Sequence, residues 1–136
     1  MMTLRISLKD GEKMIVNGAV MRAVGRTDLV VENQVALLRG REVMSPEEAV
    51  TPARRLYFAC MLAYIGGEEA RAAQQNNIVS LLGDLIAALV ADEPRALCTA
   101  IASRLATGDY YRALTECRAL ITYEAEALSR LPSQAA

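Results

Sequence analysis

The sequence predicts an α+β protein, in which a small N-terminal antiparallel β-sheet of four or five short strands precedes a C-terminal bundle of about four helices. Up to about Leu38 the hydrophobic residues recur with a period close to two, which is typical of half-buried strands. After Ser45 the period lengthens to that of amphipathic helices. Hydrophobic residues make up 53% of the chain and aromatic residues only 4%. Ala and Leu therefore supply most of the apolar mass, which favours helices.

Turn sequences divide the strand region. Leu4, Ile6 and Leu8 alternate with polar residues and predict the first strand. Asn17-Gly18 lies between two apolar runs and is a strong hairpin signal, because a type I′ turn requires positive φ at both central positions. We expect strands over residues 4–8, 14–16, 19–21 and 29–31, whereas residues 35–38 fit either a fifth strand or a single helical turn.

Cap and proline signals mark the start of the helical region. Ser45-Pro46 with Glu48 fits a capping box that has proline at the first helical position. Thr51-Pro52 repeats the pattern and predicts a helix that ends at Gly66-Gly67. Three more helices are expected, with apolar faces at residues 78, 81, 82, 85, 86 and 89, at residues 97, 101 and 105, and at residues 110, 114, 117, 121, 125 and 128. We therefore divide the chain into a strand subdomain, residues 1–43, and a helical subdomain, residues 44–136, packed as one unit.

The charge balance excludes a general nucleic-acid coat protein. The net charge is −1, so any RNA binding must come from a local patch. Residues 1–55 carry nine basic and seven acidic side chains, whereas residues 56–136 carry six basic and nine acidic ones. Thirteen of the 15 cations are Arg, which suits bidentate phosphate contacts, although a GC-rich genome produces the same preference.

Several classes of protein are disfavoured by what the sequence lacks. It contains no histidine, the usual general base and metal ligand, and no glycine-rich phosphate loop. The acidic pairs at residues 47–48, 68–69 and 92–93 lie at expected helix starts, where the helix dipole favours negative charge. We expect no enzymatic activity, no cofactor and no metal.

The expected location is the cytoplasm. Cys60, Cys98 and Cys117 form no CxxC motif, and their odd number without a signal peptide fits a reducing compartment. The most apolar stretch, residues 78–91, is too short to span a bilayer and contains Asp84. We expect a soluble protein without a membrane anchor.

Four segments together resemble the FlbT family in order and spacing. They are LKDGEKMIVNGAV at residues 8–20, LVVENQ at 29–34, MSPEEAVTPARRLYF at 44–58, and GDYYRAL with LITYE between 108 and 124. The resemblance extends from residue 4 to about residue 128. It implies a post-transcriptional regulator of flagellum biogenesis that associates with the 5′ untranslated region of flagellin mRNA and promotes its degradation. Some members act in the positive direction, so repression and activation both stay open. The resemblance also implies FlaF, which works in opposition, as a partner.

Basic residues in the first 55 positions are the candidates for RNA contact, because Arg and Lys bind phosphates while exposed aromatic rings stack on bases. A half-buried sheet also needs polar residues on its outer face, so packing alone accounts for many of them. Of Tyr110 and Tyr111, we expect one to be buried and the other to be free to stack on a base. The candidate RNA-binding residues are Arg54, Arg55, Arg5, Lys9, Lys13, Arg22, Arg26, Arg39 and Arg41.

Arg54 and Arg55 stand out because they lie in the first turn of a helix. There the dipole disfavours a cation by roughly 0.3–1 kcal/mol. An anionic ligand that also binds the free N–H groups of the helix start would explain this placement. An ion pair with Glu47 or Glu48 would explain it equally well.

Two kinds of function therefore remain open. The first is direct binding of the leader RNA. The second is a protein-interaction module in flagellar assembly, in which the acidic helical half binds a partner and makes no RNA contact. A homodimer is compatible with both, because the edges of a small sheet pair easily.

Overall fold

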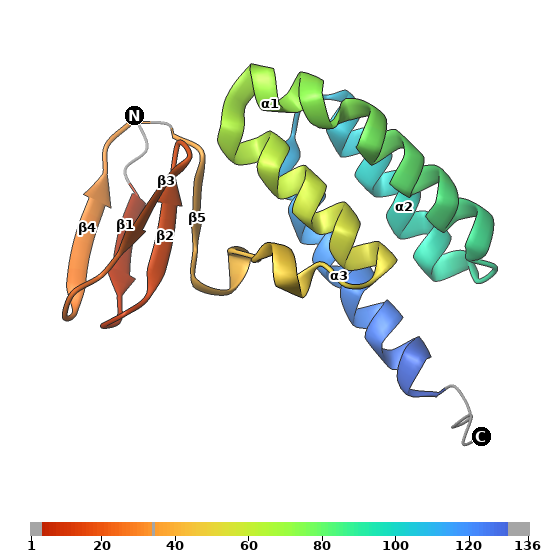
Figure 1. The fold of residues 1–136 in the computed structure, drawn as a ribbon, viewed down its shortest axis with the longest axis horizontal. Coiled ribbons are helices and arrows are strands. Elements are labelled where there is room, and N and C mark those ends of the chain that lie inside the picture. Colours follow the sequence, from red (N-terminus) through yellow and green to blue (C-terminus); the bar gives the residue numbers. More distant parts are fainter. Residues whose placement is uncertain (1–3, 34, 131–136) are drawn as a thin grey trace.

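The structure of the chain is a computed structural model that describes residues 4–33 and 35–130 (Figure 1). In these residues five strands come first and three α-helices follow, so the predicted α+β class is confirmed. The strands are β1 (Leu4–Leu8), β2 (Lys13–Val16), β3 (Ala19–Arg22), β4 (Thr27–Val31) and β5 (Leu37–Arg39). Two 3₁₀ turns, Gly40–Glu42 and Pro46–Glu48, lead to α1 (Pro52–Ala88), α2 (Asp92–Ala106) and α3 (Tyr110–Ser129).

The five strands form two antiparallel sheets, where the sequence predicted one. β1 pairs with β4, and β2 lies between β3 and β5. The turn at residues 9–12 connects the two sheets, and the N–H of Gly11 donates to the carbonyl of Ala23 over 2.8 Å. Residues 37–39 form a strand, which decides the alternative left open for that region.

The predicted β2–β3 hairpin is confirmed. Asn17 and Gly18 have φ values of 48° and 86°, as a type I′ turn requires. The turn sets Met14 opposite Met21 and Ile15 opposite Val20. Of these four, Met14 and Ile15 are buried, whereas the residues of β3 are exposed.

The expectation of about four helices is wrong, because α1 continues through the glycine pair that was expected to end the first helix. Gly67 has φ 76° and ψ −162°, which is not helical, yet the chain resumes helical geometry directly after it. Figure 1 shows that α1 bends sharply, so that its second arm runs beside α2. The two helices that were expected on either side of the glycine pair are therefore joined by a kink at Gly67, without a loop between them.

The main hydrophobic core lies among the three helices. Leu56 from α1, Ile101 from α2 and Leu120 from α3 are all almost completely buried there. The predicted apolar faces mostly point into this core. The exception is the end of α3, where Ala125 is exposed and Leu128 is 51% exposed, because this end extends beyond the other helices (Figure 1). The three cysteines are buried in this core as free thiols.

The strands and helices also contact each other. Leu38 of β5 is fully buried in the helical core, and the N–H of Leu37 donates to the hydroxyl of Tyr64 over 3.2 Å. The division of the chain at residue 43 stays a prediction. In the part of the chain that the structure describes, none of the helices is both long and apolar enough to cross a bilayer.

Candidate functional site

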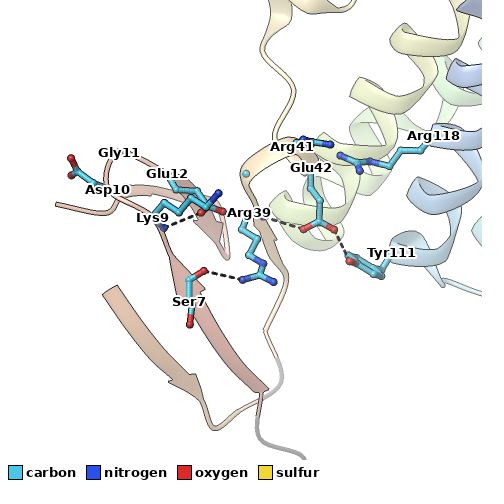
Figure 2. A pocket seen from close by; sticks show the side chains of 11 residues that line it. Ser7, Lys9, Asp10, Gly11, Glu12, Arg39, Arg41, Glu42, Tyr111 and Arg118 are labelled. Atoms are coloured by element: carbon cyan, nitrogen blue, oxygen red, sulfur yellow. Dashed lines mark hydrogen bonds between the residues drawn. The ribbon is translucent and has the colours of Figure 1, made fainter. Parts of the chain in front are cut away.

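A cleft of about 810 Å³ separates the strands from α3 (Figure 2). The turn at residues 9–12 and the end of β5 form one side, and α3 forms the other. Four of its lining side chains are basic and three are acidic, which gives a small positive excess. The basic residues are Lys9, Arg39, Arg41 and Arg118, and the acidic residues are Asp10, Glu12 and Glu42.

Glu42 holds the two sides of the cleft together. Its carboxylate accepts a hydrogen bond from the backbone N–H of Arg39 over 3.2 Å and another from the hydroxyl of Tyr111 over 2.5 Å (Figure 2). Its main-chain carbonyl accepts from the hydroxyl of Tyr57 over 2.8 Å. The Glu42 side chain is therefore engaged in positioning the cleft, and among the described residues it forms no ion pair with any of the four cations.

Within the described part of the chain, the cations of the cleft form no ion pair with a carboxylate. Among residues 4–33 and 35–130 the ion pairs are Arg104–Glu116 and Arg112–Asp109, and neither involves a residue of the cleft. The Arg39 guanidinium instead donates to the carbonyl of Ser7 over 3.3 Å, which links the two sheets (Figure 2). Positive charge that is not neutralised by the protein attracts an anion.

An aromatic ring and a further cation come from the same face of α3. Tyr111 and Arg118 are seven residues apart, which places them two turns apart along one side of the helix. Tyr111 is 44% exposed, and its ring centroid lies 5.8 Å from that of Tyr64. The Arg118 guanidinium lies 5.8 Å from the centre of the Tyr57 ring.

The hydrogen bond to Glu42 determines how Tyr111 titrates. The negative charge of the acceptor carboxylate, together with partial burial, raises the pKa of Tyr111 to about 12. Tyr111 is therefore a neutral hydrogen-bond donor at physiological pH. Its partly exposed ring is available for stacking against a planar ligand.

A second cavity, of about 410 Å³, lies beside the cleft and is lined by two basic and two acidic side chains. It shares Lys9, Asp10 and Glu12 with the cleft and adds Arg26. The Arg26 turn is held against the turn at residues 9–12, because the N–H of Gly25 donates to Asp10 Oδ1 over 2.8 Å. The structure thus brings together Lys9, Arg26, Arg39 and Arg41 of the candidate residues named from the sequence.

Three other candidate residues from the strand region do not line the cleft. Arg5 lies opposite Val30 in the first sheet. Lys13 lies opposite Arg22 in the second sheet. All three cations are exposed and are spread over the outer surface of the sheets.

Arg54 and Arg55 lie at the start of α1, and neither lines the cleft. The N–H of Arg54 donates to Thr51 Oγ1, and the N–H of Ala53 donates to Glu124 Oε2 over 3.0 Å. These N–H groups are therefore already bonded, and the chain supplies its own carboxylate at this helix start. In the described residues no ion pair joins either arginine to Glu47 or Glu48. RNA contact by this pair stays a prediction.

Sequence reasoning missed Arg118 and Glu42. Only the tertiary fold brings α3 next to the end of β5, so no local pattern could reveal their proximity. The spacing of Tyr111 and Arg118 was a usable signal, because it places both side chains on one helix face. Tyr110 is half-buried, and Tyr111 is the more exposed member of the pair.

Comparison with known proteins agrees with the sequence motifs. The family model described as Flagellar protein FlbT matches residues 4–128. The chain belongs to the FlbT family. The match extends over both sheets and almost all of the helical region, so it includes every residue that lines the cleft.

Curated FlbT proteins are similar over nearly their full length. The Flagellum biosynthesis repressor protein FlbT of Caulobacter vibrioides is 35% identical over 136 residues, covering 97% of this chain and 94% of that protein. The Probable flagellum biosynthesis repressor protein FlbT of Caulobacter sp. is 36% identical, covering 96% and 99%, and that of Agrobacterium fabrum is 37% identical, covering 93% and 85%. No solved structure matches this chain.

Proposed function

We propose that this FlbT protein is a cytoplasmic post-transcriptional regulator that binds the 5′ untranslated region of flagellin mRNA in the cleft and promotes degradation of that mRNA. The observation that carries the proposal is the convergence, beside the exposed ring of Tyr111, of four cations that form no ion pair among the residues that the structure describes. The relatives are named flagellum biosynthesis repressors, which supports the negative direction of regulation.

The chemistry of the cleft suits unpaired RNA. Lys9 and Arg41 would bind phosphates, and an unstacked base would lie on the Tyr111 ring. Asp10 and Glu12 would accept hydrogen bonds from the amino groups of a base, which is how a carboxylate distinguishes one base from another. With a volume of about 810 Å³ the cleft would hold splayed nucleotides of a loop or bulge, whereas a duplex keeps its bases inside.

Binding of the purified protein to a labelled flagellin leader RNA tests this proposal. We expect the leader to be bound in preference to a scrambled RNA of the same length and composition. The logarithm of the affinity should fall by roughly 0.7 per phosphate contact for each tenfold increase in salt. Equal binding of both RNAs, or binding insensitive to salt, would contradict direct recognition of the leader.

Protein partners belong to the same proposal. FlaF would act in opposition to this chain, and a homodimer would form by pairing of edge strands. The edge strand β3 exposes Val20 by 66%, and β4 exposes Val30 by 53%, so both present apolar surface beside free backbone groups. Light scattering at micromolar concentration measures the mass, and a monomer would contradict a tight dimer.

A further inference from the structure

An apolar groove lies on the helical half, away from the cleft. It has a volume of about 470 Å³ and runs between the second arm of α1 and α2. Ile78 and Leu82, both at least nine-tenths buried, form its floor, whereas Val79 is 63% exposed at its edge. The groove and the cleft have no lining residue in common.

Small side chains line part of this groove and leave room for the backbone of a partner helix. Ala72 on α1 and Ala102 and Ala106 on α2 line it, and all three are exposed. With only a methyl group at each of these positions, a partner helix can approach closely. The lining residues of α1 extend from Arg71 to Leu82, which is about 16 Å of helix at 1.5 Å per residue, or three turns.

One end of the groove carries a cation whose hydrogen bonding is incomplete. The Arg71 guanidinium lies over the Tyr110 ring, 4.5 Å from its centre. Arg71 Nε is buried and has no hydrogen-bond partner in the described part of the chain. No carboxylate of residues 4–33 and 35–130 forms an ion pair with Arg71. Buried donors in folded proteins are normally bonded, so the Arg71 side chain is incompletely satisfied, and a carboxylate beside its guanidinium would supply the missing counter-charge.

We propose that this groove binds an amphipathic helix of another protein, whose apolar face covers Ile78, Val79 and Leu82 and whose carboxylate pairs with Arg71. The apolar floor supplies the contact area, and the small residues permit close packing. The arginine sets the orientation of the helix, because only one end of the groove is basic. To fill three turns of groove, the partner helix needs apolar residues at positions i, i+3 or i+4, and i+7. Its acidic residue lies one helical turn beyond these apolar residues, where it meets Arg71.

Designed peptides serve as the probe. Each is a fluorescein-labelled amphipathic helix of about four turns with leucines at the anchor positions. One pair carries Glu one turn before the anchors in one peptide and one turn after them in the other, which tests both orientations. A second pair carries Gln at the same positions. Fluorescence anisotropy measures their binding to the full chain and to its variants.

We expect one Glu peptide to bind more tightly than its Gln counterpart, and Arg71→Gln to weaken that Glu peptide about fivefold while leaving the Gln peptide unchanged. Val79→Asp should weaken both peptides about tenfold, since it places a charge on the apolar edge. Val90→Asp is the matched control, because Val90 is 90% exposed and does not line the groove. It should change the affinities less than about twofold.

Several results would overturn the inference. They are no binding of any peptide at millimolar concentration, equal binding of the Glu and Gln peptides, and equal effects of the Val79 and Val90 substitutions. A wild-type dimer that Val79→Asp converts to monomer would assign the groove to self-association instead. Leader RNA binding by Val79→Asp should stay at the wild-type level, so failure of this inference is distinguishable from failure of the RNA proposal.

Discussion

The hydroxyl of Tyr111 donates a hydrogen bond to Glu42 Oε2 over 2.5 Å and so joins two residues 69 positions apart in the chain. Glu42 is the last residue of the 3₁₀ turn that follows the last strand, whereas Tyr111 lies in the first turn of α3. The bond therefore connects the strand side of the cleft with its helical side (Figure 2). Together with the Tyr57 hydrogen bond to the Glu42 carbonyl, it fixes the end of the strand region against the helices.

Replacing Tyr111 by Phe should lower the free energy of unfolding by about 1–2 kcal/mol, because a hydrogen bond to a charged acceptor is lost while the ring remains. Urea unfolding measures the change. Tyr123→Phe is the control, since the structure gives the Tyr123 hydroxyl no hydrogen bond in the described residues, and we expect less than about 0.5 kcal/mol. Equal effects of the two substitutions would mean that the Glu42 bond contributes nothing specific.

The hydrogen bond between Tyr111 and Glu42 also predicts a loss of stability at alkaline pH. The pKa of Tyr111 is raised to about 12 in the folded chain, chiefly by the hydrogen bond to Glu42, whereas it is 10.0 in the unfolded reference. The stabilising contribution is therefore complete below pH 10.0 and is lost as the pH rises toward 12. Urea midpoints measured across this range should fall less steeply for Tyr111→Phe than for wild type. Parallel curves would contradict the assignment.

Gly67 and Gly83, two of the three glycines of α1, should respond oppositely to alanine. Gly67 has φ 76° and ψ −162°, a region almost confined to glycine, so Gly67→Ala should destabilise the chain by about 1–3 kcal/mol. Gly83 is exposed within the second arm, and a Cβ there would meet open space. Gly83→Ala should therefore stabilise by about 0.5–1 kcal/mol. Thermal unfolding distinguishes the signs, and stabilisation by both substitutions would mean that Gly67 is not needed for the kink.

Glu124 should stabilise the start of α1 from a distant helix. It accepts from the N–H of Ala53 over 3.0 Å and lies at the positive end of the helix dipole. Glu124→Gln, which removes the charge, should cost about 1 kcal/mol, measured by urea unfolding. Glu126→Gln on the exposed side of α3 provides the comparison and should be nearly neutral. A neutral Glu124→Gln would show that the carboxylate is not a cap.

Much of the fold was predictable because it depends on local patterns. Asn17-Gly18 specified the hairpin, and the spacing of apolar residues after Ile78 located the second arm of α1. The partition of the strands into two sheets was not predictable, because strand pairing depends on contacts between residues far apart in sequence. Gly67 was recognised as a break, but local sequence does not show whether the chain resumes a helix immediately.

The candidate site was predictable only in part. Lys9, Arg39 and Arg41 were named because the basic residues of the strand half were all candidates, and the sequence could not separate them from Arg5 or Lys13. Which of these cations face α3 is decided by the tertiary fold, so the local sequence could not distinguish the cleft residues from the others. Arg118 lies in the C-terminal part of the chain, residues 56–136, which has a net negative charge. The charge distribution therefore gave no reason to select Arg118 as a candidate.

The most direct measurement compares two charge-matched double variants on the labelled flagellin leader RNA. Lys9→Ala with Arg41→Ala removes two cations from the cleft, and Arg54→Ala with Arg55→Ala removes two from the start of α1. We expect the first to weaken binding about tenfold or more and to lower the salt slope by roughly 1.4, which corresponds to two phosphate contacts. The second should stay within about twofold of wild type. Full binding by the cleft variant, or loss of binding only in the Arg54/Arg55 variant, would contradict the cleft as the RNA site.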